Sequence, residues 1–238
     1  DPRLDALAEM SKTQKTVYAT VEVVDIGGLV EGASKGEGLG NKFLANIREV
    51  DAIVFVLRAF EDDDIPGPSD PLEHLRIVEI ELALADLETV ETRLSRAQKT
   101  SRMDKSVTEE MEALERAQVH LAEGRPLYRA GITEDDRALL APHFLLTARR
   151  VLAVVNVAED KIDTIPEMEA IVRAELAPPG SASANDVEVL GMSVQLEAEA
   201  AQLTGQDRID MLEALGLGEG ALPRMVRSAY HLLGLRTY

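Results

Sequence analysis

The chain has 238 residues, 45% of them hydrophobic, which suffices for the core of one large domain or two ordinary ones. Its 25 basic and 43 acidic residues give a formal net charge of −18, which disfavours broad coating of nucleic acid and excludes DNA as an expected partner. It has no cysteine, no apolar run long enough for a membrane span and no secretory signal pattern, so we expect a cytoplasmic protein with no membrane partner.

Four short apolar runs rich in β-branched residues predict strands. They lie at residues 16–24, 52–57, 151–155 and 187–192. Their apolarity is continuous rather than alternating, which is typical of a parallel sheet with both faces covered. Helical patterns fall between the runs, so the predicted fold class is α/β.

The first run ends at Asp25, and Gly28 follows three residues later. P-loop nucleotide hydrolases use this pattern to hold a water on Mg²⁺ and to offer a backbone N–H to a γ-phosphate. Asp25 alone would equally suit a turn. The glycine-rich continuation to Gly40 favours a loop that orders around a phosphate. Leu29 stands where Ras-like GTPases carry the glutamine that orients the attacking water, so hydrolysis would need polar groups from elsewhere.

Between the second and third runs, apolar residues recur with helical spacing in two segments, 77–97 and 107–121. Pro71 suits a first helical turn, and 124–126 suits a stop. The polar link at 99–102 predicts an antiparallel helical hairpin. A basic cluster near its tip is formed by Arg93, Arg96, Lys99, Arg102 and Lys105. Two ordinary surface helices on the sheet, with the cluster as a solvated face, are the alternative.

Polar residues follow the third and fourth runs. Asn156, Val157 and Glu159 stand where guanine-specific nucleotide hydrolases carry Asn-Lys-x-Asp, whose aspartate accepts hydrogen bonds from guanine. The longer Glu159 cannot keep that bidentate geometry, so guanine specificity is weakened. Ser193 and Val194 stand where nucleotide switches place a small loop against the base, although Ser193 is equally read as a helix N-cap.

Taken together, the motifs resemble the YchF, or Obg-like ATPase, family. The resemblance rests on segments that occur in family order over nearly all the chain, namely 25–30, 36–49, 60–65, 81–87 and 156–159. It implies a Ras-like P-loop NTPase sheet with an inserted antiparallel coiled-coil helical domain. Residues 1–70 and 143–238 would then form the nucleotide-binding domain, and 71–142 the insertion.

The resemblance also implies a ribosome-associated protein that hydrolyses ATP with Mg²⁺ and prefers ATP over GTP. Carried over by position, Asp25 would serve the metal and Gly28 would sense the γ-phosphate, with the catalytic position Leu29 withdrawn from it. The adenine base would be contacted by the residues that follow the third and fourth runs, namely Asn156, Val157, Glu159, Ser193 and Val194. Arg93, Arg96, Lys99 and Arg102 would contact the ribosome. The acidic run 61–64 belongs to the resemblance, and a metal site and a plain solvated loop are both open interpretations of it.

Two departures qualify these expectations. No Gly-x-x-x-x-Gly-Lys-Ser/Thr motif occurs in the sequence, so the loop that grips phosphates is missing, together with the strand that leads into it. The family's β-rich TGS domain is missing as well. We therefore expect a fragment that binds nucleotide weakly or not at all, from an intact ATPase. The alternatives are a nucleotide-independent module that docks a ribosomal or protein partner, and an Obg-type GTPase.

Overall fold

The computed structural model describes residues 2–17, 19–24, 50–62, 64, 67–100, 105–177 and 186–235. Three strands form the sheet, β1 (Ala52–Ala59), β2 (Arg150–Val157) and β3 (Val187–Met192). The longer helices are α1 (Pro2–Met10), α3 (Pro71–Thr100), α4 (Lys105–Ala122), α7 (Ile165–Leu176), α9 (Gln206–Ala214) and α10 (Ala221–Leu232). The shorter helices are α5 (Leu127–Ala130), α6 (Glu134–Leu140) and α8 (Val194–Ala200), with 3₁₀ turns η2 (Ala141–His143), η3 (Leu146–Ala148) and η4 (Glu159–Thr164).

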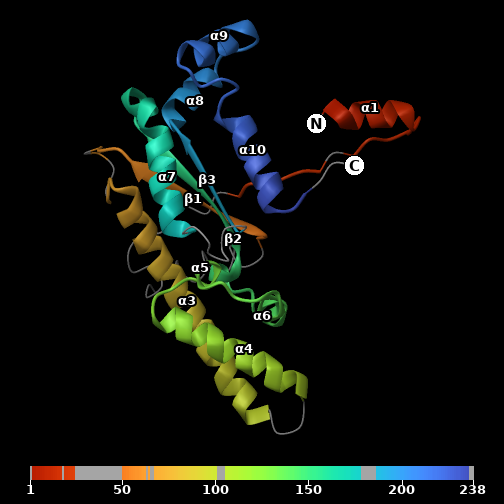
Figure 1. Cartoon of the computed structure of the whole chain (residues 1–238), viewed down its shortest axis with the longest axis vertical. Helices are drawn as coiled ribbons and strands as arrows, with labels where there is room; N and C mark the ends of the chain where they lie inside the picture. The colour runs from red at the N-terminus through yellow and green to blue at the C-terminus, as the bar shows by residue number, and fades with distance from the viewer. Residues whose placement is uncertain are drawn as a thin grey trace.

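The sheet is parallel and has the order β1-β2-β3 (Figure 1). Ala52 pairs with Arg150, and Val151 pairs with Val187, so all three strands run in register toward the same edge. Helices connect them, as parallel pairing requires. This confirms three of the four predicted strands and the predicted α/β class.

Helices cover both faces of the sheet. Buried side chains of α3 and α7 meet one face, which is built from Ile53, Phe55, Leu57, Val151, Ala153, Val155, Val187 and Val189. Helix α10 covers the other face over β2 and β3, where Leu152, Val154 and Leu190 are buried with Leu232. On that second face β1 is less covered, since Val56 is 57% exposed. Continuous apolarity in the sequence thus reflects burial on both sides of the strands.

The strand predicted at 16–24 is wrong for the residues that the structure describes there. Residues 16, 17 and 19–24 belong to no described strand. Val17 and Val23 are 72% and 68% exposed. The segment instead passes α10, where the Tyr230 hydroxyl donates to the carbonyl of Ala19. β-branched residues favour an extended backbone, but a strand also needs a neighbouring edge to satisfy its N–H and C=O groups.

Helices α3 and α4 pack side by side and extend away from the sheet (Figure 1). Their shared core contains Val90 and Leu94 of α3 with Ala113, Leu114, Ala117 and Leu121 of α4. Helix α3 begins at Pro71 and α4 ends at Ala122, close to the predicted start and stop. The described residues therefore form the expected helical pair, and its classification as an inserted coiled-coil domain stays a prediction.

Buried and partly buried polar contacts join α3 to α7, one of the helices that cover the sheet. Glu79 of α3 accepts hydrogen bonds from the Tyr128 hydroxyl at 2.6 Å and from Arg129 Nη1 at 2.8 Å. Arg129 also binds Glu175 of α7, both at the carboxylate (2.9 Å) and at the backbone carbonyl (2.7 Å). One arginine on α5 thus links α3 to α7. Because Arg129 donates through a planar fork, the link has a defined geometry.

Candidate functional site

The residues predicted to contact a base lie at the carboxyl end of the sheet. Asn156 is near the end of β2 and pairs in register with Met192 of β3, and Ser193 and Val194 follow directly. Glu159 begins η4. Because the carboxyl ends of parallel strands share one edge, residues from distant parts of the sequence meet there, and ligands of open α/β sheets bind at such edges.

Asn156 and Val194 are in direct contact. The backbone N–H of Val194 donates to Asn156 Oδ1 at 3.0 Å. The side chain of Ser193, the residue before α8, makes no capping bond, and its buried hydroxyl has no partner among the described residues. The first amide of α8 is therefore satisfied by β2 rather than by Ser193. This orients Asn156 with its carbonyl in use and leaves its NH₂ group without a bond to a described residue.

Glu159 meets a residue that sequence reasoning did not single out. Gln195 Nε2 donates to Glu159 Oε2 at 3.0 Å, and both side chains are exposed. Val157, by contrast, is 2% exposed and offers a ligand almost no surface. The structure therefore brings together Asn156, Glu159, Ser193 and Val194 and adds Gln195. A glutamine just inside a helix has no sequence signal of its own.

The predicted metal and phosphate residues, Asp25, Gly28 and Leu29, lie outside the described residues. Within the described ranges, no group of three or more His, Asp or Glu side chains is arranged to hold a metal ion. The roles of these three residues therefore stay predictions.

Arg58 shapes the loop that follows β1 at the same edge. It pairs in register with Asn156 and is 9% exposed. Its Nε donates to the carbonyl of Pro68 at 3.0 Å, and its Nη2 donates to the carbonyl of Gly67. In the acidic run, Asp64 N donates to Asp62 Oδ1 at 2.9 Å, which is an ordinary turn contact. The sequence signal that could have found this anchor is an arginine directly after an apolar strand run.

Comparison with known proteins decides the family. A family model described as 50S ribosome-binding GTPase matches residues 7–122. The ribosome-binding ATPase YchF of Bacillus subtilis is 39% identical over 242 residues, covering 100% of this chain and 65% of that protein. Its Haemophilus influenzae counterpart is 40% identical with the same coverage. The structure of the Schizosaccharomyces pombe YchF GTPase matches with a TM-score of 0.76 and 31% identity, covering 98% of this chain and 63% of that chain.

The chain belongs to the YchF family. It spans about 65% of the length of the curated YchF relatives that it matches. The fold is that of a parallel-sheet, P-loop GTPase-like domain rich in helices. This confirms the resemblance inferred from the motifs.

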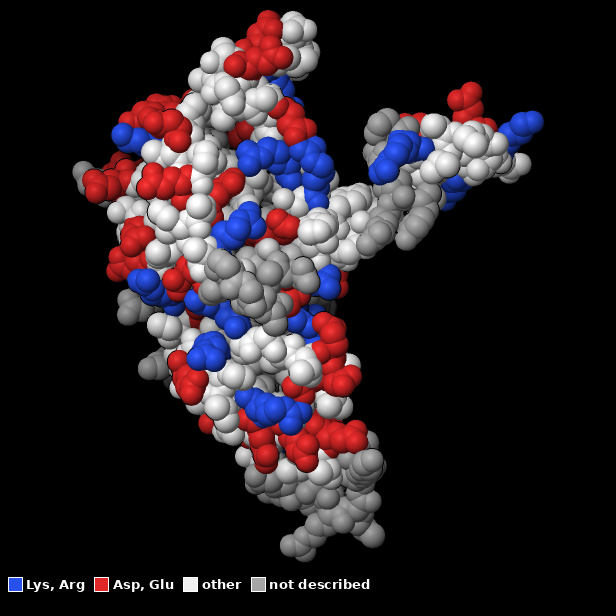
Figure 2. Space-filling model, viewed as in Figure 1, with Lys and Arg blue, Asp and Glu red and all other residues white. Residues whose placement is uncertain are grey.

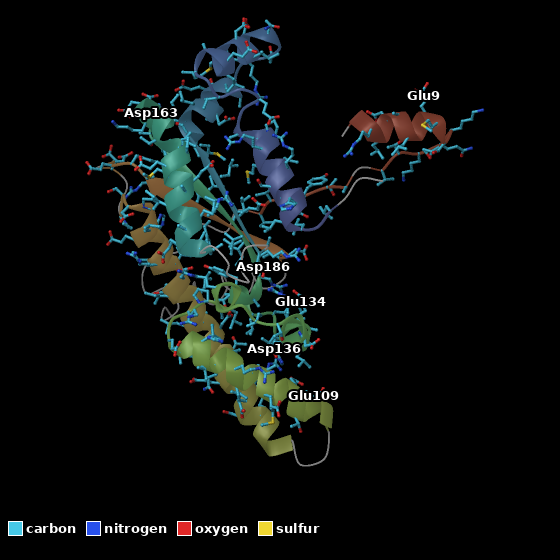
Figure 3. The ribbon with its side chains drawn as sticks, viewed as in Figure 1. Glu9, Glu109, Glu134, Asp136, Asp163 and Asp186 are labelled. Atoms are coloured by element: carbon cyan, nitrogen blue, oxygen red, sulfur yellow. The ribbon has the colours of Figure 1, made fainter. Side chains whose placement is uncertain are left out.

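A pocket of about 560 Å³ lies at the amino end of the sheet, opposite the edge that holds Asn156. It is lined in part by Arg137, Arg149, Arg150 and the exposed Phe144. Asp186, just ahead of β3 and close to α6 (Figure 3), binds Arg137 Nη2 at 2.6 Å and lies 3.5 Å from Arg150 Nε. Arg137 and Arg150 thus bind the residue ahead of β3, and the pocket is separate from the Asn156 edge.

The predicted ribosome contact is only partly described. Arg93 and Arg96 are exposed on α3, whereas the side chains of Lys99 and Arg102 lie outside the described residues. On the described part of the helical pair, Lys and Arg side chains alternate with Asp and Glu (Figure 2). No helix in the described ranges is long and apolar enough to cross a membrane.

Proposed function

We propose that this chain is the nucleotide-binding core of a ribosome-associated ATPase, which transfers the γ-phosphoryl group of ATP to water. Family membership supports the proposal, since curated relatives are called ribosome-binding ATPases. The single observation that carries it in this chain is the contact between Asn156 and Val194. That contact orients a polar amide at the sheet edge where α/β proteins bind ligands.

The proposed roles follow the two sides of the site. On the base side, Asn156 and Glu159 offer polar groups to a purine, beside Ser193 and Val194. On the phosphate side, Asp25 would hold Mg²⁺ and Gly28 would donate a backbone N–H to the γ-phosphate. When bound, Mg²⁺ supplies charge neutralisation on the phosphates. Leu29 is apolar, so the attacking water must be oriented by another group.

The proposal is tested at Asn156 in the protein as its gene encodes it. Asn156→Asp keeps an oxygen to accept from Val194 N–H, so α8 stays capped, but it removes the NH₂ donors. We expect about tenfold weaker ATP binding with an unchanged thermal midpoint, because one hydrogen bond to the base is lost. Displacement of a fluorescent ATP analogue measures the affinity. Gln202→Ala, an exposed change outside the site, is the control.

The outcomes separate the proposal from its alternatives. If the encoded protein neither hydrolyses ATP nor binds nucleotide, the remaining alternative is a nucleotide-independent module that docks a ribosomal or protein partner. Equal displacement by GTP would favour an Obg-type GTPase. For the 238-residue chain by itself, we expect titration with Mg-ATP to show weak binding, because its sequence contains no phosphate-gripping motif.

One observation favours a docking role alongside hydrolysis. Helices α3 and α4 extend well beyond the sheet (Figure 1), and their far part packs against no described strand. A paired helix of this kind offers a long exposed surface to a partner. We propose that this surface, including Arg93 and Arg96 and extending to Lys99 and Arg102, contacts the ribosome.

A further inference from the structure

Gln195 and Glu159 form an exposed hydrogen-bonded pair at the edge of the site. Gln195 is the second residue of α8, and Glu159 is the first residue of η4, so the pair joins the segments that follow β3 and β2. An exposed hydrogen bond adds little to folding stability, because water competes for both groups. Its effect is to set which groups of the carboxylate and the amide remain available.

The pair presents an acceptor next to a donor. The Gln195 amide carries two hydrogens, and one of them binds Glu159 Oε2. No described residue binds the other oxygen of Glu159 or the second amide hydrogen. A carboxylate free of Gln195 would instead present two acceptors, because an ionised carboxylate only accepts.

These two arrangements match different bases. Guanine presents its ring N1–H and its 2-amino group as two adjacent donors, which a free carboxylate accepts with both oxygens. Adenine presents a 6-amino donor beside the N1 acceptor, which an acceptor next to a donor matches. The base that does not match leaves polar groups without hydrogen-bond partners, which weakens its binding.

Asn156 does not supply a preference for adenine. Its carbonyl is held by Val194 N–H, so only its NH₂ group is left to donate. The N7 atom of a purine accepts such a donor in adenine and in guanine alike. The preference for adenine over guanine must therefore come from the Gln195–Glu159 pair.

We propose that Gln195 is a specificity-determining residue that, by engaging Glu159, favours adenine over guanine nucleotides. The inference rests on the proposed function, because it requires a purine nucleotide at this edge. Gln195 holds one oxygen of Glu159 and offers its second amide hydrogen to the base, so its role is in recognising the base and not in the phosphoryl transfer.

The experiment compares nucleotide selectivity in the encoded protein and its variants. Competition by ATP, GTP and ITP against a fluorescent nucleotide gives three affinities for each protein. In Gln195→Ala we expect the preference for ATP over GTP to fall about tenfold. The gain in affinity is larger for GTP than for ITP, because ITP lacks the 2-amino group that the second carboxylate oxygen would accept. In Gln195→Lys, an N–H donor to Glu159 remains and the preference is kept.

A matched control exists on α9. Gln206 Nε2 donates to Asp210 Oδ1 at 2.7 Å in an exposed pair of the same chemistry outside the site, so Gln206→Ala should leave all three affinities unchanged. If Gln195→Ala keeps the ATP preference within about twofold, the inference is overturned while the proposed function stands. If the unaltered protein binds no nucleotide, the proposed function fails and this inference fails with it.

Discussion

At the scale of single residues, the Asp86 carboxyl group joins two parts of the fold through three hydrogen bonds. It is fully buried on α3 and accepts from Leu146 N (2.9 Å), Thr147 N (2.7 Å) and Thr147 Oγ1 (2.7 Å). The hydrogen bonds place η3, and therefore the start of β2, against α3. A buried carboxyl group is tolerated when its oxygens accept hydrogen bonds in this way.

We predict that Asp86→Ala lowers the free energy of unfolding by about 3 kcal/mol, because two buried amides and a hydroxyl lose their acceptor. Urea denaturation followed by circular dichroism measures the change. Glu88→Ala, at an exposed position of the same helix, should change it by less than about 0.5 kcal/mol. A similar small loss for Asp86→Ala would contradict the role assigned to this carboxylate.

Residue patterns predicted which residues meet at this edge of the sheet for a clear physical reason, and their role as a site stays a prediction. Asn156 and Val194 were expected together because each follows a strand of one parallel sheet, and the structure joins them by a hydrogen bond. Gln195, Asp86 and Glu79 were missed. Each is a polar residue on a helix, where sequence periodicity records only which side chains are apolar and cannot tell a buried, paired polar group from a solvated one.

At the scale of elements, the contact between α3, α5 and α7 depends on the ionisation of Glu79. Burial raises the pKa of Glu79 above its ordinary value of 4.5, although the hydrogen bond from Tyr128 and the charge of Arg129 act in the opposite direction. The folded state therefore holds this proton to higher pH than the unfolded chain. The stability that Glu79 contributes is complete below its pKa in the unfolded chain. It is lost as the pH rises through its pKa in the folded protein.

We predict that the stability difference between the unaltered protein and Glu79→Gln declines as the pH rises above about 4.5, because only the unaltered protein loses this proton on the way. Denaturation midpoints taken at intervals from pH 4 to pH 8 measure the difference. Glu88→Gln, at an exposed position of the same helix, is the control. A difference for Glu79→Gln that grows with pH would mean that Arg129, rather than burial, dominates.

Helix ends were predictable from the sequence, whereas strand pairing was not. The ends of the α3–α4 region were predicted well, because proline and glycine have strong local preferences at helix termini. The run at 16–24 has the composition of a strand and no described partner, since strand pairing depends on what lies beside the segment in space. Local preference is readable from sequence, whereas pairing is a property of the assembled sheet.

At the scale of the whole molecule, charge decides how the protein meets a polyanion. With a formal net charge of −18, the chain is repelled by RNA phosphates at long range, so an approach must use a local basic surface. The tip of the helical pair is the place where the sequence concentrates such residues. Contacts of this kind weaken as salt is added.

We predict that changing Arg93, Arg96, Lys99 and Arg102 to glutamate weakens ribosome co-sedimentation about tenfold at low salt and leaves ATP turnover near normal, because the tip is far from the Asn156 edge. Arg93 and Arg96 changed alone should give part of the loss. Changing Arg76 and Arg125, exposed residues away from the tip, should give none. Undiminished co-sedimentation of the fourfold variant would remove the tip as a contact.

The parallel pairing of β1 with β2 has a consequence for how the chain is made. All of α3 through η3 lies between these two strands, so β1 leaves a translating ribosome long before its partner exists. The neighbouring helices α3 and α4 need only each other to bury Val90, Leu94 and Leu114. Local contacts form quickly and distant ones slowly. We therefore expect the helical pair to fold first on the nascent chain. The apolar β1 then stays unpaired until β2 has been synthesised.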